Sequence, residues 1–127
     1  MNKYLIRELA KQYGWSLIVT DRANHLIYYD FIKQTSGGIT FCFTAEMKVD
    51  NLKFLIDDIL DFIDVFDPES YADEWLDKSV KIDSAYYLRV VTEMDDIRSS
   101  AWLFVYDLMY EYEMEQKLTD FPGWLWN

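Results

Sequence analysis

The spacing of apolar residues changes twice along this chain, and the changes divide it into a helical start, a β-rich segment and a helical remainder. Residues 2–12 carry apolar side chains at spacings of three and four, which predicts a short amphipathic helix that stops at Gly14. Residues 15–20 and 25–32 are rich in β-branched and aromatic residues and flank a turn-forming segment, so they predict a β-hairpin.

A third strand is predicted over residues 39–47, after a turn at Gly37 and Gly38. Its residues alternate at period two, with Ile39, Phe41, Phe43 and Ala45 on one face and Thr40, Cys42, Thr44 and Glu46 on the other. The three strands together predict an antiparallel sheet.

Beyond residue 47 the apolar spacing returns to three and four. It predicts a helix over residues 51–65 with Asp50 as its N-cap. A short helix over residues 68–77 follows, begun by a proline and anchored by Trp75 and Leu76.

The remaining helical region extends over residues 83–117, either in one piece or in two pieces broken near residues 93–96. Acidic side chains crowd that segment, and the apolar pattern lapses there. In the second half of the region the inward stripe is formed by Ile97, Ala101, Phe104, Leu108 and Tyr112.

These elements predict an α+β fold: an N-terminal helix, a three-stranded antiparallel sheet, then three or four helices packed on one face of the sheet. We expect a single domain over residues 1–127. Its parts are the helix and sheet (1–49), an acidic helical part (50–117) and an aromatic C-terminal segment (118–127). In that last segment Trp124 and Trp126 either fold back onto the body or dock on another chain.

Composition supports a folded protein in spite of its high charge. The chain has 127 residues, of which 51% are hydrophobic and 18% aromatic, so it can bury a sizeable core. It contains no apolar run long enough to span a membrane, and its first residues are too charged for a signal peptide. We therefore expect a soluble, cytoplasmic protein that does not bind membranes.

The net charge of −11 is distributed unevenly along the sequence. Residues 1–49 contain four acidic and six basic side chains, whereas residues 50–77 contain ten acidic and one basic. The predicted sheet half is thus slightly basic and the helical half strongly acidic. Such a field repels nucleic acid and favours a basic protein partner.

The residues needed for common catalytic and metal sites are scarce. His25 is the only histidine and Cys42 the only cysteine, so neither a zinc site nor a histidine-based triad can be assembled within one chain. We interpret Cys42 as a small buried thiol and His25 as a partly exposed strand residue. No phosphate-binding glycine motif occurs. We expect no enzymatic activity, no cofactor and no metal; an enzyme that uses paired carboxylates is the least favoured class.

Two rows of carboxylates are the candidate binding residues. Asp57, Asp61 and Asp64 share one face of the helix predicted over 51–65, opposite its apolar stripe, and lie about 6 and 4.5 Å apart along the axis. A second row, on the last helix, is formed by Asp107, Glu111 and Glu115 and is interleaved with Tyr106 and Tyr110. Stacked like charges destabilise a helix slightly, which favours a functional explanation. The alternative is a solvated acidic face that serves solubility.

Residues 41–114 resemble small acidic accessory proteins encoded by bacteriophages and conjugative elements of gut bacteria. The resemblance is carried by the aromatic strand and by an acidic helix that leads into the string F-D-P-E-x-x-A-x-x-W, from Phe66 to Trp75. Two further helices with Asp95 and Asp96 near their junction complete it. Some small acidic proteins of such elements are antirestriction or other anti-defence factors, including DNA mimics. The resemblance therefore implies a mobile-element setting.

The sequence thus favours a non-enzymatic interaction protein that binds a basic surface, for example the nucleic-acid-binding groove of a defence protein, by mimicking phosphate charge. The residues expected to carry this are Asp57, Asp61, Asp64, Asp107 and Glu111. The alternative is a structural or assembly module that forms a homodimer through an aromatic interface. That interface would contain Tyr106, Tyr110, Trp124 and Trp126.

Overall fold

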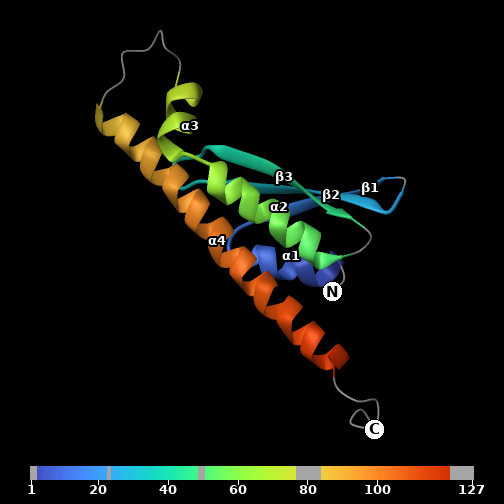
Figure 1. Cartoon of the computed structure of the whole chain (residues 1–127). Coiled ribbons are helices and arrows are strands. Elements are labelled where there is room, and N and C mark those ends of the chain that lie inside the picture. The colour runs from blue at the N-terminus through green and yellow to red at the C-terminus, as the bar shows by residue number, and fades with distance from the viewer. Residues whose placement is uncertain (1–2, 23, 49–50, 77–83, 121–127) are drawn as a thin grey trace.

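A computed structural model of the chain describes residues 3–22, 24–48, 51–76 and 84–120. Its elements, in chain order, are α1 (Lys3–Lys11), β1 (Ser16–Arg22), β2 (Leu26–Gln34), β3 (Thr40–Lys48), α2 (Leu52–Val65), α3 (Pro68–Trp75) and α4 (Ser84–Asp120) (Figure 1). The fold is α+β, as the sequence predicts.

The three strands form one antiparallel sheet in the order β1-β2-β3. In its register Leu17 lies opposite Phe31, and Phe31 lies opposite Phe43, so these side chains share one face. The predicted alternation of the third strand is confirmed: Phe41, Phe43 and Ala45 are buried, whereas Thr40, Cys42 and Thr44 are exposed.

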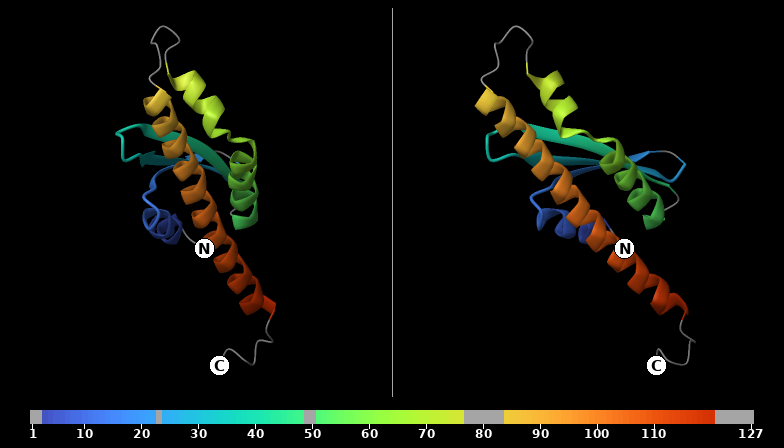
Figure 2. Two further views of the ribbon diagram at one scale, coloured as in Figure 1. Left: turned by 90° about the vertical axis from the view of Figure 1, so that its left-hand side faces the viewer. Right: turned by 60° about the vertical axis from the view of Figure 1, so that its left-hand side comes forward.

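The helices cover one face of this sheet. In Figures 1 and 2, α4 runs diagonally across the sheet, with α1 on one side of it and α2 on the other. Helix α1 contacts β1, and α2 contacts β3. Helix α3 packs on the N-terminal part of α4, where a hydrogen bond between Tyr87 and Asp73 raises the pKa of the tyrosine.

Stacked aromatic rings join the two layers. The ring centroids of Phe43 and Phe62 are 4.0 Å apart with almost parallel planes, and those of Phe31 and Phe43 are 4.8 Å apart. Phe104 of α4 lies 5.4 Å from Phe31. One continuous aromatic core thus connects β2 and β3 to both α2 and α4.

Helix side chains also cover the outer strands of the sheet. Arg7 of α1 donates through Nη1 to the carbonyl oxygen of Leu17 at 3.3 Å. Asp58 of α2 accepts from the backbone N–H of Glu46 at 2.7 Å. These bonds satisfy edge groups that could otherwise pair with another strand.

Helix α4 is continuous, so of the two alternatives the unbroken helix is the one observed. The acidic side chains of residues 93–96 do not share one direction: Glu93 is only 6% exposed, whereas Asp95 and Asp96 are exposed. Glu93 accepts a hydrogen bond from the hydroxyl of Ser36, in the β2–β3 turn, at 3.2 Å. The apolar pattern therefore lapses at residue 93 because Glu93 occupies a buried position, where its carboxylate contacts the β2–β3 turn.

Several local predictions differ from the structure. Asn51, not Asp50, is the N-cap of α2, because its side chain accepts from the backbone N–H of Lys53 at 3.0 Å. Leu76 is buried as predicted, but Trp75 is 44% exposed, because the short α3 has only a narrow buried face.

The single cysteine and the single histidine also lie in places that the sequence did not predict. Cys42 is exposed, because it belongs to the sheet face opposite the helices. Its partial desolvation and the nearby Asp30 carboxylate raise the pKa of its thiol. His25 is exposed in the β1–β2 turn with a φ of 59°, and β2 begins only at Leu26.

Within the residues that the structure describes, no helix combines the length and apolar character required to cross a membrane.

Candidate functional site

A groove of about 830 Å³ lies between the C-terminal half of α2 and the middle of α4. Its apolar lining comes from Leu60, Ile63, Trp102 and Leu103, and its polar lining from Asp61, Asp64, Asp95, Arg98 and Ser99. Three carboxylates and one guanidinium leave the groove with two net negative charges.

The α2 wall follows from the amphipathic pattern of that helix. Leu55, Ile56 and Ile59 are buried against the sheet and α4, which turns Asp57, Asp61 and Asp64 to solvent. Asp61 and Asp64 lie on the α4 side of the exposed face and line the groove. The sequence-based row is therefore continuous and accessible, and two of its three members belong to one site.

Charges on α2 are arranged against its helix dipole. Lys53 lies in the first turn, where the dipole is positive, and Asp64 lies in the last turn, where it is negative. No basic side chain occupies the last turn of the helix. This arrangement lowers the stability of α2 and concentrates negative potential at the groove.

Arg98 holds the two walls together. Its Nε donates to the carbonyl oxygen of Ile63, in the last turn of α2, at 3.2 Å. Carbonyl groups of a last helical turn lack intrahelical partners, so this bond satisfies one of them. The guanidinium thereby fixes the distance between α2 and α4 at the groove.

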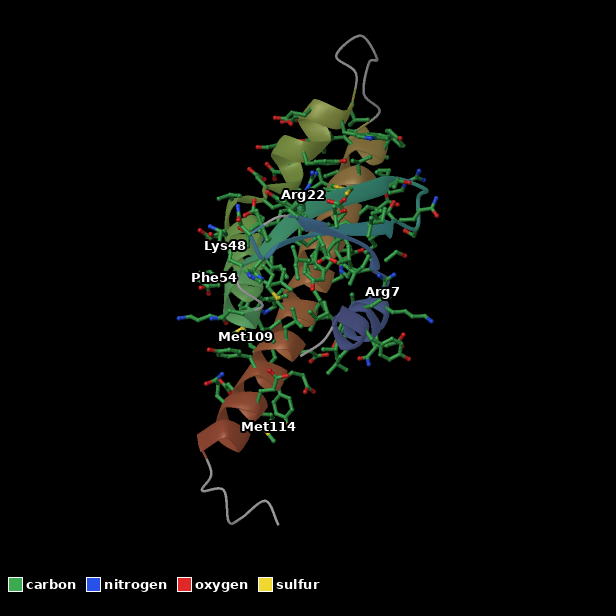
Figure 3. The ribbon with its side chains drawn as sticks, turned by 90° about the vertical axis from the view of Figure 1, so that its right-hand side faces the viewer. Arg7, Arg22, Lys48, Phe54, Met109 and Met114 are labelled. Atoms are coloured by element: carbon green, nitrogen blue, oxygen red, sulfur yellow. The ribbon has the colours of Figure 1, made fainter. Side chains whose placement is uncertain are left out.

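The α4 wall consists of one helical stripe. Asp95, Ser99 and Trp102 are spaced i, i+4 and i+7, so they face the same side of the helix. The indole of Trp102 is 46% exposed and Leu103 is 51% exposed. Further along α4 the exposed apolar surface continues with Tyr106, Tyr110 and Met114; Figure 3 labels Met114 on the part of α4 that extends past the sheet.

Asp57 lies in a second, smaller hollow of about 180 Å³ at the other end of α2. It is lined by Glu46, Lys48, Phe54, Asp57, Asp58 and Asp61. Figure 3 shows Lys48 and Phe54 close together on this side of the molecule. Asp61 lines both hollows, so the acidic row of α2 connects them.

The second predicted row lies elsewhere. Asp107 accepts a hydrogen bond from the hydroxyl of Tyr13, the second residue after α1, at 2.5 Å. Glu111, one turn further along α4, is half-buried. Since α1 and α2 lie on opposite sides of α4 (Figure 2, left), the structure does not bring these two residues together with Asp61 and Asp64.

Of the predicted aromatic interface, Tyr106 and Tyr110 are about equally exposed, at 61% and 60%. They lie one turn apart on the same side of α4 as Trp102 and Leu103. Trp124 and Trp126 lie outside the described residues.

The two charged groove residues of α4, Asp95 and Arg98, were not proposed as binding residues from the sequence. The signal for Asp95 is present, because Asp95, Ser99 and Trp102 have helical spacing. That spacing places them on one stripe only if the helix continues through residues 93–96. The alternative of a break there concealed the relationship.

Among the described residues, no group of three or more His, Cys, Asp and Glu side chains is arranged to hold a metal ion. Comparisons with protein-family models, with characterised proteins and with solved structures give no significant match.

Proposed function

We propose that this protein is a non-enzymatic interaction protein that binds a basic surface of another protein through the groove between α2 and α4. The observation that carries this proposal is the groove itself, which combines an apolar lining with two net negative charges and a row of exposed carboxylates beside it. A surface of this kind buries apolar area while its carboxylates pair with arginine and lysine.

The acidic row of α2 supports a form of DNA mimicry limited to one side of the molecule. Asp57, Asp61 and Asp64 present a short line of negative charge, whereas Asp107 is engaged by Tyr13 on the far flank of α4. We infer that the partner binds a single line of negative charge, such as the phosphates of one DNA strand present. The resemblance of residues 41–114 to accessory proteins of mobile elements directs the search to host restriction and CRISPR effectors.

The test is a salt-dependent binding assay with purified restriction and CRISPR effectors as partners. Asp57→Lys/Asp61→Lys should abolish binding, and duplex DNA should compete with the wild-type protein. The matched control is Glu69→Lys/Glu74→Lys, which changes net charge equally at exposed positions of α3. Equal binding by both variants, or the absence of any salt-sensitive partner, would refute the proposal.

A second candidate function is a homodimeric assembly module. It is favoured by the exposed apolar surface of α4, formed by Trp102, Leu103, Tyr106, Tyr110 and Met114. Light scattering distinguishes the two functions. The assembly module is supported if the wild-type protein is a dimer, if Tyr106→Ser/Tyr110→Ser dissociates that dimer, and if Asp57→Lys/Asp61→Lys leaves it unchanged.

A further inference from the structure

We propose that the groove between α2 and α4 is a receptor for an arginine side chain, with the guanidinium paired to Asp61 and Asp64 and stacked on the indole of Trp102. This inference rests on the proposed function, because it names the group of the basic partner that the groove recognises. The ligand class is a guanidinium presented on an exposed segment of another protein.

The first argument is the unbalanced charge of the α2 wall. Asp61 and Asp64 make no side-chain hydrogen bond within the described part of the chain, and both are exposed. They lie near the C-terminal end of α2, whose dipole adds negative potential. An incoming cation therefore gains from both carboxylates and from the helix terminus.

The second argument is that the resident cation is already committed. Arg98 donates through Nε to the Ile63 carbonyl oxygen at 3.2 Å, which fixes it as part of the groove wall. Its single charge offsets only one of the three carboxylates that line the groove. Two negative charges remain for a ligand.

The third argument selects guanidinium over ammonium. A guanidinium is planar, pairs with carboxylates through two parallel bonds and stacks on aromatic faces, whereas an ammonium is compact and strongly hydrated. The half-exposed indole of Trp102 stands across the groove from Asp61 and Asp64. A carboxylate wall facing an indole wall thus fits a flat cation between them.

This chain already places cations over aromatic rings. The Arg89 guanidinium carbon lies 5.3 Å from the ring centroid of Tyr86, and that of Arg22 lies 5.6 Å from the ring of Tyr28. Among the described residues, Trp102 takes part in no such contact. Its exposed ring is therefore available to a cation from outside.

The experiment follows the indole N–H signals of the full chain by NMR during titration with short peptides. The probes are a glycine-spaced peptide with two arginines, its lysine counterpart and its neutral citrulline counterpart. The signal of Trp102 is identified by its loss in Trp102→Phe. We expect the arginine peptide to shift this signal saturably, the lysine peptide to bind more weakly, and the citrulline peptide not to bind.

Variants locate the site. Trp102→Ala should weaken binding of the arginine peptide about two- to fivefold, the range expected for loss of an exposed cation–π contact. Asp61→Asn/Asp64→Asn should abolish it. The matched control is Trp75→Ala, because Trp75 is exposed to a similar extent, 44%, among acidic residues of α3 and outside the groove.

The outcomes separate this inference from the proposed function. Equal affinities for the arginine and lysine peptides overturn guanidinium recognition and leave the acidic binding surface intact. A shift at another tryptophan with none at Trp102 overturns the location. If neither peptide binds and no basic protein binds either, both proposals are wrong.

Discussion

The hydroxyl of Tyr13 donates a hydrogen bond to Oδ2 of Asp107 at 2.5 Å, which ties the segment after α1 to the C-terminal half of α4. The two residues are 94 positions apart in the sequence. The bond gives Asp107 a structural role on the flank of α4 that faces away from the groove.

Removing this bond should destabilise the protein in a pH-dependent way. Hydrogen bonding to Asp107, then desolvation, then the negative charge of Asp107 raise the pKa of Tyr13, so the folded state holds its proton more tightly than the unfolded state does. The stabilisation is complete below the ordinary tyrosine pKa of about 10 and is lost as pH rises through the raised folded value. We expect Tyr13→Phe to lower the free energy of unfolding by about 0.5–1 kcal/mol at neutral pH.

Urea titrations of wild type and Tyr13→Phe from neutral to alkaline pH measure this difference. The gap between the two proteins should shrink at alkaline pH. A gap that stays constant across the range would show that the hydroxyl contributes through packing alone.

Neutralising the groove carboxylates should stabilise the fold. Asp61→Asn/Asp64→Asn removes like charges from one helix face and negative charge from the C-terminal end of α2, for a gain of about 0.5 kcal/mol at low salt. Thermal melts at low and high salt measure the effect, which should disappear at high salt.

The control for that experiment lies in the same helix. Asp58→Ala removes one negative charge where the double variant removes two, but Asp58 accepts from the backbone N–H of Glu46, so the substitution should lower stability by about 1 kcal/mol. If both changes shift the melting temperature in the same direction, charge placement does not govern the stability of α2.

Gly37 and Glu93 should be energetically coupled. A Cβ added at Gly37 would overlap the carboxylate of Glu93, which is buried and accepts a hydrogen bond from Ser36, so the carboxylate would have to shift and lose this bond. We expect Gly37→Ala to destabilise the protein by about 1–3 kcal/mol. The penalty should be much smaller in the Glu93→Ala background. A double-mutant cycle by chemical denaturation tests this, and additive effects would contradict it.

Cys42 should be accessible and yet slow to react at neutral pH. Its thiol is exposed, but desolvation and the Asp30 carboxylate raise its pKa, so little thiolate is present. Iodoacetamide should modify it increasingly fast as pH rises, and Asp30→Asn should shift the rate profile to lower pH. Desolvation is the larger of the two causes of the raised pKa, so this shift should be small, and an unshifted profile would contradict a contribution from Asp30.

The local elements of the fold could be predicted because each is encoded by a nearby pattern. The period-two alternation from Phe41 to Ala45 requires only that one side of a strand be buried, and the structure buries that side. In α2 the spacing of Leu55, Ile56 and Ile59 fixes which face is buried and therefore which face carries Asp57, Asp61 and Asp64. Such patterns act within a few residues and do not depend on the rest of the chain.

The candidate site was only half predictable for the same reason. Its α2 wall lies within one helix, so the sequence located Asp61 and Asp64. Its α4 wall depends on the continuity of α4 through Glu93, which is stabilised by Ser36 from a turn 57 positions earlier. A contact over that separation leaves no periodic trace in the sequence.

The sequence by itself determined the α+β class, the predominance of acid in the helical half and the exposed row on α2, because hydrophobic spacing and charge are local properties. Only the tertiary structure decided that Asp107 faces Tyr13 while Asp61 and Asp64 face Trp102. Packing sets the rotation of α4 against its neighbours: Ile97, Ala101, Phe104 and Leu108 are buried toward the core. That rotation directs one edge of the helix to α1 and the other to α2. The grouping of carboxylates with the indole is thus a product of helix packing.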